Sequence, residues 1–313
     1  MKYLVTGGAG FIGSHIAERL VKEGERVRVL DNLDAGKMEN LAPLGDRVEF
    51  IKGDIRSRED IKKAVQGIDY ILHQAALRSV PKSMTRPIEY HEVNVTGTFN
   101  LLNEAKGAGV KKVVFASSSS IYGVTDKFPQ KEGSEAMAVS PYALTKKLGE
   151  EYCQFYSSVF GLPTVCLRYF NVFGPRQSLD DDYAVVIPKF ITFLLQGKRP
   201  PIYGDGTQSR DFTFIANVVD ANLAALRSDV GRGEAINVAC GDSHSVLSLA
   251  EQIAKLALVN GIKPEYLPPR PGDVPKTQAD ITRLRKLLGI TPRISFQEGL
   301  RTTIQWFQTQ KAA

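Results

Sequence analysis

The chain has 313 residues, of which 43% are hydrophobic and 24% are charged, so it can fold around a sizeable core. Its 40 lysines and arginines exceed its 34 aspartates and glutamates, but the basic residues are scattered among acidic ones. This pattern argues against a nucleic-acid-binding surface and favours attraction of an anionic small molecule. No apolar run approaches the roughly 18 residues of a membrane span, and we expect no signal peptide.

The cysteines and histidines indicate which disulfide and metal sites can be expected. The three cysteines give no disulfide framework and no paired metal-ligand spacing, which predicts a reducing compartment and a cytoplasmic protein: Cys153, Cys166 and Cys240. The histidines do not fall within ligand spacing of one another, so we expect no metal site. Helix-surface or loop positions are expected for all four: His15, His73, His91 and His244.

Short apolar runs alternate with amphipathic stretches through the first half of the chain. The apolar runs are residues 2–6, 26–31, 47–51, 69–73, 111–116 and 163–168, and the amphipathic stretches are residues 13–23, 58–66, 92–108 and 142–159. Continuous apolar strands separated by helices predict a doubly wound parallel α/β sheet, a Rossmann-type fold, with ligands at its carboxyl edge.

The pattern loosens after Asn171, where proline and glycine separate shorter elements and predict a smaller α/β substrate lobe. Residues 235–239 are again strand-like, so we expect the chain to return to the main sheet. The predicted domains are residues 1–171 with about 213–240 for the dinucleotide, and about 172–212 with 241–313 for the substrate.

Three glycines, Gly7, Gly10 and Gly13, follow the first apolar run and open the first helix. A glycine turn allows close approach of a pyrophosphate, which the free N–H groups of the helix would bind. Asp31 ends the next apolar run, where a carboxylate binds both ribose hydroxyls and repels a 2′-phosphate. We therefore expect NAD rather than NADP.

A second motif follows the run 111–116, which leads into four consecutive serines, 117–120. Tyr142 and Lys146 lie four residues apart at the start of the last amphipathic stretch, so the ammonium is expected near the phenol. A cation there, with the positive nicotinamide ring, would lower the pKa of the tyrosine toward neutrality and make it a base.

These motifs resemble the extended short-chain dehydrogenase/reductase family, and within it the nucleotide-sugar 4-epimerases, along nearly the whole chain. Further matching segments are residues 53–55, 73–76, 94–98, 168–171, 204–212 and 270–273. The resemblance assigns these residues to NAD: Gly7, Gly10, Phe11, Ile12, Gly13, Asp31, Asn32, Asp54, Ile55, Gln74, Ala75, Ala76, Asn94, Tyr142, Lys146 and Tyr169. It assigns these to the nucleotide sugar: Arg78, Ser118, Ser119, Ser120, Tyr142, Asn171, Gln177, Val185, Tyr203, Arg210, Arg270, Asp273 and Thr277.

Two serine positions separate the chemistries of this family. Its 4,6-dehydratases resemble Thr-Asp-Glu across residues 118–120, and its UDP-glucuronate decarboxylases carry a glutamate in place of Ser120. Neither carboxylate is present, so the resemblance implies C4 epimerisation through a 4-keto sugar. It also implies that NAD is tightly bound and regenerated in each turnover. Tyr142 would then be the base, Ser118 would bridge it to O4, and Lys146 would tune the tyrosine and bind the nicotinamide ribose.

The sugar itself is left open. Thr277 stands where a bulky tyrosine narrows the pocket around C2 in some relatives, which leaves room for an N-acetyl group and favours UDP-GlcNAc/UDP-GalNAc, with UDP-Glc/UDP-Gal as a further candidate. Arg78 replaces a small residue and would attract a C6 carboxylate, which keeps a UDP-glucuronate 4-epimerase or decarboxylase-like enzyme as an alternative. A non-catalytic NAD(H)-binding module is a remote alternative. Family members often pair two helices across a twofold axis, so we expect a homodimer through residues 92–108 and 142–159.

Overall fold

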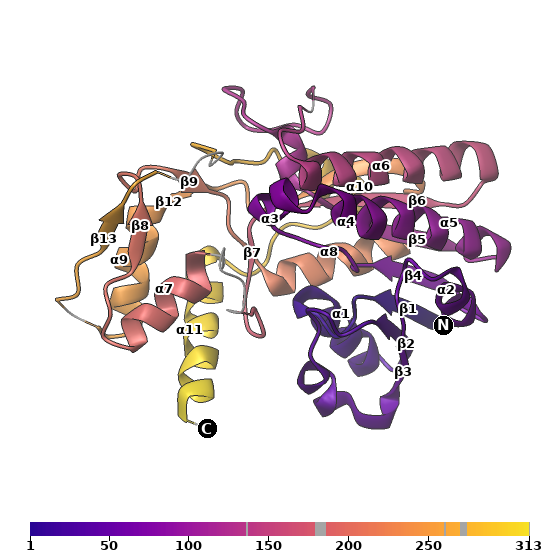
Figure 1. The fold of residues 1–313 in the computed structure, drawn as a ribbon, viewed down its shortest axis with the longest axis horizontal. Helices are drawn as coiled ribbons and strands as arrows, with labels where there is room; N and C mark the ends of the chain where they lie inside the picture. Colours follow the sequence, from indigo (N-terminus) through magenta and orange to yellow (C-terminus); the bar gives the residue numbers. More distant parts are fainter. Residues whose placement is uncertain (136, 179–185, 260, 270–273, 313) are drawn as a thin grey trace.

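A single large sheet organises the protein. The structure is a computed structural model that describes residues 1–135, 137–178, 186–259, 261–269 and 274–312. Seven strands lie in the order β11-β6-β5-β4-β1-β2-β3, and every neighbouring pair is parallel (Figure 1). Their bounds are β1 (Lys2–Thr6), β2 (Arg26–Asp31), β3 (Val48–Lys52), β4 (Tyr70–His73), β5 (Lys112–Ser118), β6 (Thr164–Tyr169) and β11 (Arg232–Val238). The predicted doubly wound parallel sheet is therefore confirmed.

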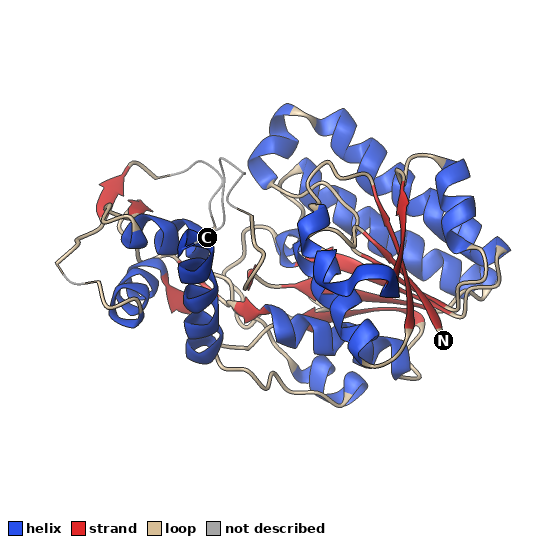
Figure 2. Cartoon of the chain, turned by 90° about the horizontal axis from the view of Figure 1, so that it is seen from below, coloured by secondary structure: helices blue, strands red, loops and turns tan. Residues whose placement is uncertain are grey.

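Helices cover both faces of this sheet (Figure 2). On one face, α1 (Phe11–Lys22) packs against α8 (Ile215–Arg227), and on the other α5 (Gly97–Gly107) packs against α2 (Arg58–Val65) and α6 (Pro141–Phe160). Two clusters of buried apolar side chains fill the spaces between the sheet and these layers. Helix α10 (Thr282–Leu288), although late in the chain, contacts β11 and α8.

A smaller group of elements lies at the left of Figure 1, and β7 lies between this group and the large sheet. Strands β8 and β13 pair in parallel, β9 and β12 pair antiparallel, and β7 and β10 pair in parallel. The bounds are β7 (Val172–Phe173), α7 (Val186–Leu195), β8 (Pro201–Tyr203), β9 (Ser209–Arg210), β10 (Thr213–Phe214), β12 (His244–Ser245), α9 (Val246–Leu256), β13 (Glu265–Leu267) and α11 (Phe296–Ala312). Within the part of the chain that the structure describes, no helix has the length and hydropathy required to cross a bilayer.

Local sequence signals account for the helix that carries the predicted base. Ser140 caps α6 by accepting a hydrogen bond from the backbone N–H of Ala143, and Pro141 occupies the first turn. Gly161 ends the helix in the left-handed conformation, at φ 69°. These caps fix the start of α6 at the carboxyl end of β5.

Two segments differ from the expected elements. Strand β5 runs through Ser118, and the 3₁₀ turn η4 (Ser119–Tyr122) follows it directly, so half of the serine run is strand. The helix expected at residues 92–108 begins with a π turn, η3 (Glu92–Thr96), and is preceded by α3 (Val80–Thr85) and α4 (Pro87–His91). Two further 3₁₀ turns, η1 (Met38–Asn40) and η2 (Ala42–Arg47), lie between β2 and β3.

Candidate active site

The glycine turn between β1 and α1 is packed so closely that side chains cannot be added without displacement. Gly7 has φ 68°, and a Cβ on it would lie 2.7 Å from the backbone nitrogen of Ala75. A Cβ on Gly13 would lie 2.2 Å from the carbonyl oxygen of Gly7. Helix α1 begins at Phe11, and its N-cap, Gly10, makes no side-chain capping bond. The turn therefore offers uncapped helix N–H groups to an anion, which fits the pyrophosphate of NAD.

Asp31 stands at the end of β2, beside this turn. Its carboxylate accepts hydrogen bonds from the backbone N–H groups of Ala9 at 2.9 Å and Leu33 at 2.8 Å. Burial raises the pKa of Asp31 in spite of these two bonds. Gly36 packs against the carboxylate, since a Cβ there would lie 2.7 Å from Oδ1. The chain thus holds this carboxylate rigidly at the strand end, in the place expected for a ribose-binding group.

Asp54, which we expected near the adenine, is held by two neighbours. Arg56 donates two hydrogen bonds to its carboxylate, at 3.0 and 2.7 Å, and the amide of Asn32 donates a third at 3.0 Å. The hydrogen bonds from Arg56 are the largest influence that lowers the pKa of Asp54, to about 2. The next residue, Ile55, is buried beneath Gly97 of α5. The structure therefore brings Asn32 and Asp54 together beyond the ends of β2 and β3.

We expect the Gly13→Ala variant to lose affinity for NAD. The added methyl group overlaps the Gly7 carbonyl, and overpacking of this kind costs about 1–3 kcal/mol. If that cost falls on the binding turn, the dissociation constant of NAD rises about 5- to 150-fold. Isothermal titration of protein stripped of nucleotide measures it. Gly107→Ala in α5 is the matched control, because no atom lies within 4 Å of its added Cβ; equal affinities in the two variants would contradict the assignment.

His73 is buried at the end of β4, so the prediction of a helix-surface or loop position was wrong. Its ring bonds the hydroxyl of Thr6 at 2.7 Å and the hydroxyl of Thr98 at 3.0 Å. Thr98 donates its own proton to the carbonyl of Asn94, so His73 Nε2–H donates to Thr98 and Nδ1 accepts from Thr6. Burial lowers the pKa of His73 to about 3. The neutral imidazole therefore links the end of β1, at Thr6, to the first turn of α5, at Thr98. His244 also differs from that prediction, because it lies in β12.

Asn94, at the π turn, holds two parts of the site in place. Its amide bonds the backbone of Leu77 in both directions, at 2.8 and 3.0 Å, and also donates to the hydroxyl of Thr145 at 3.0 Å. Thr145 in turn donates to the carbonyl of Tyr142. The residue assigned to the nicotinamide half thus connects the loop after β4 to the helix of the base.

Gln74 and Tyr169 meet at a third residue that the sequence analysis missed. The Tyr169 hydroxyl lies 3.2 Å from the Gln74 amide oxygen and 3.0 Å from the amide oxygen of Asn222, a fully buried side chain on α8. Gln74 also donates to Asn222 at 3.2 Å. The only sequence signal for the role of Asn222 was the presence of an asparagine within an apolar helix.

Ser118 and Tyr142 come together at the carboxyl end of β5. A side-chain hydrogen bond with Ser118 is one of the influences on the Tyr142 phenol, and the bridge to O4 that the resemblance implies stays a prediction. Burial is the largest influence on the pKa of Tyr142 and raises it, while the bond from Ser118 and the charge of Arg78 act to lower it. In the protein alone the pKa of the phenol therefore lies above that of an exposed tyrosine, and the expected lowering by the positive nicotinamide ring stays a prediction.

The ammonium of Lys146 is held by a strand carbonyl, and its expected effect on the Tyr142 phenol stays a prediction. Its Nζ donates to the carbonyl of Ala116 at 2.8 Å and lies 5.1 Å from the centre of the Phe115 ring. Burial lowers the pKa of Lys146 to about 8. Arg78 is instead the cation whose charge reaches Tyr142. The four-residue spacing places Tyr142 and Lys146 on one face of α6. The position of the Lys146 ammonium, however, is set by its hydrogen bond to the Ala116 carbonyl on β5.

The segment that carries Arg78 is fixed by its backbone. The hydroxyl of Tyr90 donates to the carbonyl of Arg78 at 2.6 Å, and the Tyr90 ring meets the Tyr142 ring edge-on at 6.4 Å. The next residue, Ser79, has φ 106°, a strained value for serine, and caps α3. Arg78 itself is exposed.

Asn171 and Thr277 are joined on the substrate side of the sheet. Asn171 has φ 31°, and its amide nitrogen donates to the carbonyl of Asp211 at 3.2 Å and to the hydroxyl of Thr277 at 3.1 Å. The Thr277 hydroxyl also accepts from the backbone N–H of Asp211 at 3.2 Å. The buried Asp211 carboxylate accepts backbone N–H bonds from three further residues, and the sequence analysis did not identify this role: Cys240, Gly241 and Ala279.

A cavity of about 790 Å³ opens beside this cluster. Tyr203, Ser209, Leu267 and Lys276 are among the residues that line it, and Arg210 follows Ser209 on β9. Its volume lies within the range of small-molecule sites. Gln177 is buried, and its side-chain amide donates a hydrogen bond to the Val172 carbonyl. Three assigned residues lie outside the described part of the chain: Val185, Arg270 and Asp273.

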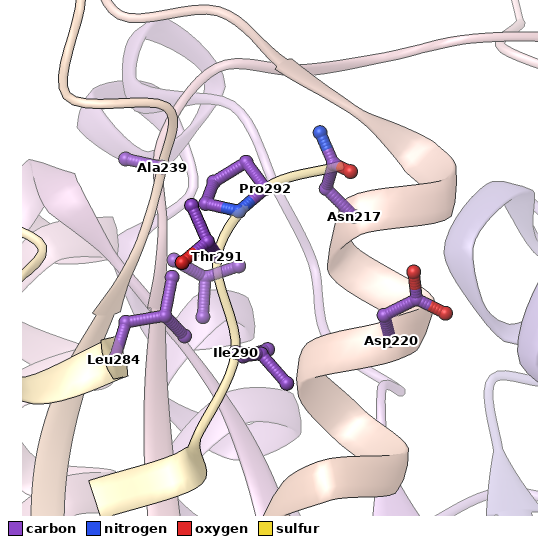
Figure 3. A pocket seen from close by; sticks show the side chains of 8 residues that line it. Asn217, Asp220, Ala239, Leu284, Ile290, Thr291 and Pro292 are labelled. Atoms are coloured by element: carbon purple, nitrogen blue, oxygen red, sulfur yellow. The ribbon is translucent and has the colours of Figure 1, made fainter. Parts of the chain in front are cut away.

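A second, much smaller cavity of about 10 Å³ lies where a loop crosses α8. Figure 3 shows Ile290, Thr291 and Pro292 on the loop and Asn217 and Asp220 on the facing helix. The Asn217 side chain donates to the carbonyl of Ile294 and accepts from the backbone N–H of the same residue. A space of this size holds about one water molecule, so the feature fastens a loop rather than binding a substrate.

Behind the serine strand lies a buried ion pair that the sequence analysis also missed. Glu150, on α6, accepts hydrogen bonds from Arg168 at 2.9 and 2.7 Å and from the Ser117 hydroxyl at 2.5 Å. Arg168 also donates to the Tyr122 hydroxyl at 3.0 Å. The pair joins α6, β5 and β6 directly behind Ser118.

Comparison with known proteins agrees with this geometry. The model of the NAD dependent epimerase/dehydratase family matches residues 3–239. UDP-N-acetyl-alpha-D-glucosaminuronate decarboxylase of Bacillus cytotoxicus is 38% identical, with 97% of both chains covered, and UDP-glucose 4-epimerase of Mycolicibacterium smegmatis is 38% identical, with 99% of both covered. The structure of UDP-N-acetylglucosamine 4-epimerase from Methanobrevibacter ruminantium M1, in complex with UDP-N-acetylmuramic acid, has a TM-score of 0.94 and 42% identity, covering 99% of this chain and 98% of that one. The expected resemblance is confirmed, and the chain belongs to the NAD dependent epimerase/dehydratase family as an NAD-dependent enzyme.

Proposed function

We propose that the protein epimerises a UDP-hexose at C4 through a transient 4-keto sugar. The observation that carries this proposal is the pairing of Ser118 with Tyr142 at the carboxyl end of β5, a strand that only β4 separates from β1 and its glycine turn. The turn after β5 offers serines and no carboxylate at residues 119 and 120, so it lacks the extra acid or base of the dehydratases and decarboxylases.

The residues of the chain divide the work as follows. The Tyr142 phenolate takes the O4 proton while Ser118 donates a hydrogen bond to the phenolate oxygen. NAD, held by the glycine turn and Asp31, would supply the hydride acceptor and then the hydride donor, so that C4 is oxidised and reduced with no net redox change. Between the two steps the sugar turns over, held only by its diphosphate, for which Arg210 and Arg270 are the proposed clamps. Tyr142 then returns the proton to O4.

We propose that the two parts of the chain share these tasks. Residues 1–171 with about 213–240 bind NAD, and about 172–212 with 241–313 bind the nucleotide sugar. The cavity bounded by Tyr203, Ser209 and Lys276 supports the second assignment. The remaining assigned residues keep the roles that the family resemblance implies.

An N-acetylated sugar is favoured by the hydrogen-bonding capacity of Thr277 and Asn171. Both N–H groups of the Asn171 amide are donated to protein acceptors, which leaves Oδ1 as an acceptor. The Thr277 oxygen already accepts two bonds, and among the described residues its proton has no acceptor. The Asn171 Oδ1 can therefore accept a hydrogen bond from the N–H of an acetamido group, and the Thr277 hydroxyl can donate one to its C=O. UDP-GlcNAc/UDP-GalNAc is therefore the proposed substrate pair, with UDP-Glc/UDP-Gal as a further pair.

We expect the Thr277→Val variant to lose selectivity for the acetamido group. Valine keeps the shape of threonine but removes the hydroxyl, and one hydrogen bond contributes about 1–1.5 kcal/mol. The kcat/KM for UDP-N-acetylglucosamine should fall about 5- to 10-fold more than that for UDP-glucose. Thr277→Ser retains the hydroxyl and is the matched control. Equal losses with both substrates would mean that Thr277 is only a structural contact.

A uronate substrate is the second candidate, because one observation favours it. Arg78 is exposed and its charge acts on the Tyr142 phenol, which supports its guanidinium as the group that would bind a C6 carboxylate. The relative from Bacillus cytotoxicus is named for a sugar that is both N-acetylated and a uronate. Ser120 argues against decarboxylation and leaves UDP-glucuronate 4-epimerisation as the form of this alternative.

The test is to incubate the purified protein, without added cofactor, with UDP-N-acetylglucosamine, UDP-glucose and UDP-glucuronate separately. The anomeric proton signals in NMR then report any C4 epimer. Epimerisation of UDP-N-acetylglucosamine is the expected result, and turnover of UDP-glucuronate alone would move the assignment to the second candidate. No epimer in any tube, even with NAD added, would overturn the proposed function.

We also propose a homodimer built on the outer faces of α5 and α6. Large apolar side chains are exposed there, where a second copy would cover them: Phe99, Leu144, Phe155, Val159 and Phe160. Two of these rings contact each other, since the ring centres of Phe155 and Phe160 lie 5.5 Å apart. Light scattering coupled to gel filtration gives the mass, and a monomer would contradict the proposal.

A cytoplasmic location is proposed from the thiols. Cys153, Cys166 and Cys240 are all free, and the first two are buried. Free cysteines are typical of a reducing compartment. Fractionation of cells that produce the protein tests this assignment, and recovery outside the cytoplasm would contradict it.

A further inference from the structure

Ser120 fixes the direction in which the Ser118 hydroxyl donates its proton. Ser118 caps the turn η4 by accepting a hydrogen bond from the backbone N–H of Ser120 at 3.2 Å. The Ser120 hydroxyl also lies 2.9 Å from the Ser118 oxygen. A hydroxyl has two acceptor lone pairs and one proton. When Tyr142 is a phenolate, the Ser118 proton goes to that charged oxygen, and the Ser120 hydroxyl must then be the donor to Ser118.

We infer that Ser120 is a positioning residue, which acts through Ser118 by donating to its oxygen and so holding the Ser118 proton toward Tyr142. With both acceptor positions of Ser118 occupied by Ser120, the Ser118 oxygen has no lone pair left for the O4 proton of the sugar. The proton then passes directly from O4 to the Tyr142 phenolate, and Ser118 stabilises the phenolate rather than relaying the proton. This inference rests on the proposed epimerase reaction and changes the bridging role that the resemblance implied for Ser118.

The groups around the Tyr142 phenol determine whether its pKa rises or falls when the Ser120 hydroxyl is removed. Ser118 faces Tyr142 from β5, Arg78 faces it from the loop before α3, and the Tyr90 ring packs on it from α4. Lys146, on the same helix, is bonded to the Ala116 carbonyl. The hydrogen bond from Ser118 favours the phenolate and lowers the pKa of Tyr142, whereas burial opposes it. Loss of the Ser120 hydroxyl weakens the first influence, so the pKa of Tyr142 should rise.

The experiment compares the pH profiles of kcat for the holoenzyme and two variants at Ser120. For Ser120→Ala, the acidic limb should move up by about 0.5–1 pH unit, with kcat about 3- to 10-fold lower on that limb and restored at higher pH. Ser120→Thr keeps the donor and should restore the wild-type limb. Thr125→Ala, which removes a hydroxyl from the loop just beyond η4, is the matched control and should leave the limb unchanged.

A second measurement does not depend on turnover. Ultraviolet difference titration of phenolate formation, with the Tyr142→Phe holoenzyme subtracted, follows Tyr142 alone. Ser120→Ala should move this titration upward by the same amount as the kinetic limb. A raised KM with both titrations unchanged would overturn the inference and make Ser120 a substrate contact. Wild-type protein that titrates at Tyr142 but epimerises no UDP-sugar would instead refute the proposed function and leave the Ser120 contact standing.

Discussion

Replacing Tyr142 with phenylalanine should reduce kcat by about 10²–10⁴-fold, the range that a positioned general base contributes. The ring and its edge-on contact with Tyr90 remain, so the change removes only the hydroxyl that takes the O4 proton. KM should change little, because the diphosphate clamps lie elsewhere. Single-turnover NMR with the UDP-sugar measures the residual rate.

The variant must still fold and hold NAD for this loss to be meaningful. Bound nucleotide released by denaturation, together with the melting temperature, provides that control. Undiminished turnover in Tyr142→Phe would remove Tyr142 from the reaction and refute the proposed mechanism. A small loss that is fully reversed at high pH would indicate that another base, such as solvent hydroxide, serves O4.

Replacing Glu150 with alanine should lower the free energy of unfolding by about 3–5 kcal/mol, since it leaves a buried cation without its partner. The side chains of Arg168 and Glu150 are only 8% and 11% exposed. Arg168 would keep its contacts to Tyr122 and to the Glu132 carbonyl, neither of which carries a negative charge. Denaturant titration at fixed NAD and protein concentrations gives the difference, because bound ligand and partner subunits shift apparent stability.

A double variant distinguishes the cost of leaving the Arg168 charge unpaired from the cost of losing the packing of the Glu150 side chain. Glu150→Ala combined with Arg168→Met removes both charges, so it should be more stable than Glu150→Ala alone. If the double variant is instead destabilised by the sum of the two single changes, the pair is not coupled and the buried ion pair does not explain the loss.

The parallel sheet could be predicted because its strands are short apolar runs at regular intervals, and burial of both faces leaves no other arrangement. The glycine turn, Asp31 and Ser118 could be placed because each lies at the carboxyl end of a strand, and all parallel strands end at one edge. Val80–Thr85 and Pro87–His91 were missed as helices, since each spans fewer than two turns and gives no readable periodicity.

The contacts of Lys146, His73 and Asn222 could not be predicted from spacing. A lysine side chain has four rotatable bonds, and the buried hydrogen bond to the Ala116 carbonyl fixes where the Lys146 ammonium lies. His73 and Asn222 are single polar residues in apolar segments, and their partners come from other strands and helices. Such partners depend on tertiary packing, which local sequence does not encode.

The central claim is that C4 is inverted by removal and return of one hydride, and substrate deuterated at C4 tests it most directly. The preferred UDP-sugar, labelled at C4 and incubated in ordinary water without added cofactor, should give an epimer that keeps its deuterium at C4. Loss of the label to solvent would contradict the account, because it would mean that C4 is inverted through exchange of a proton.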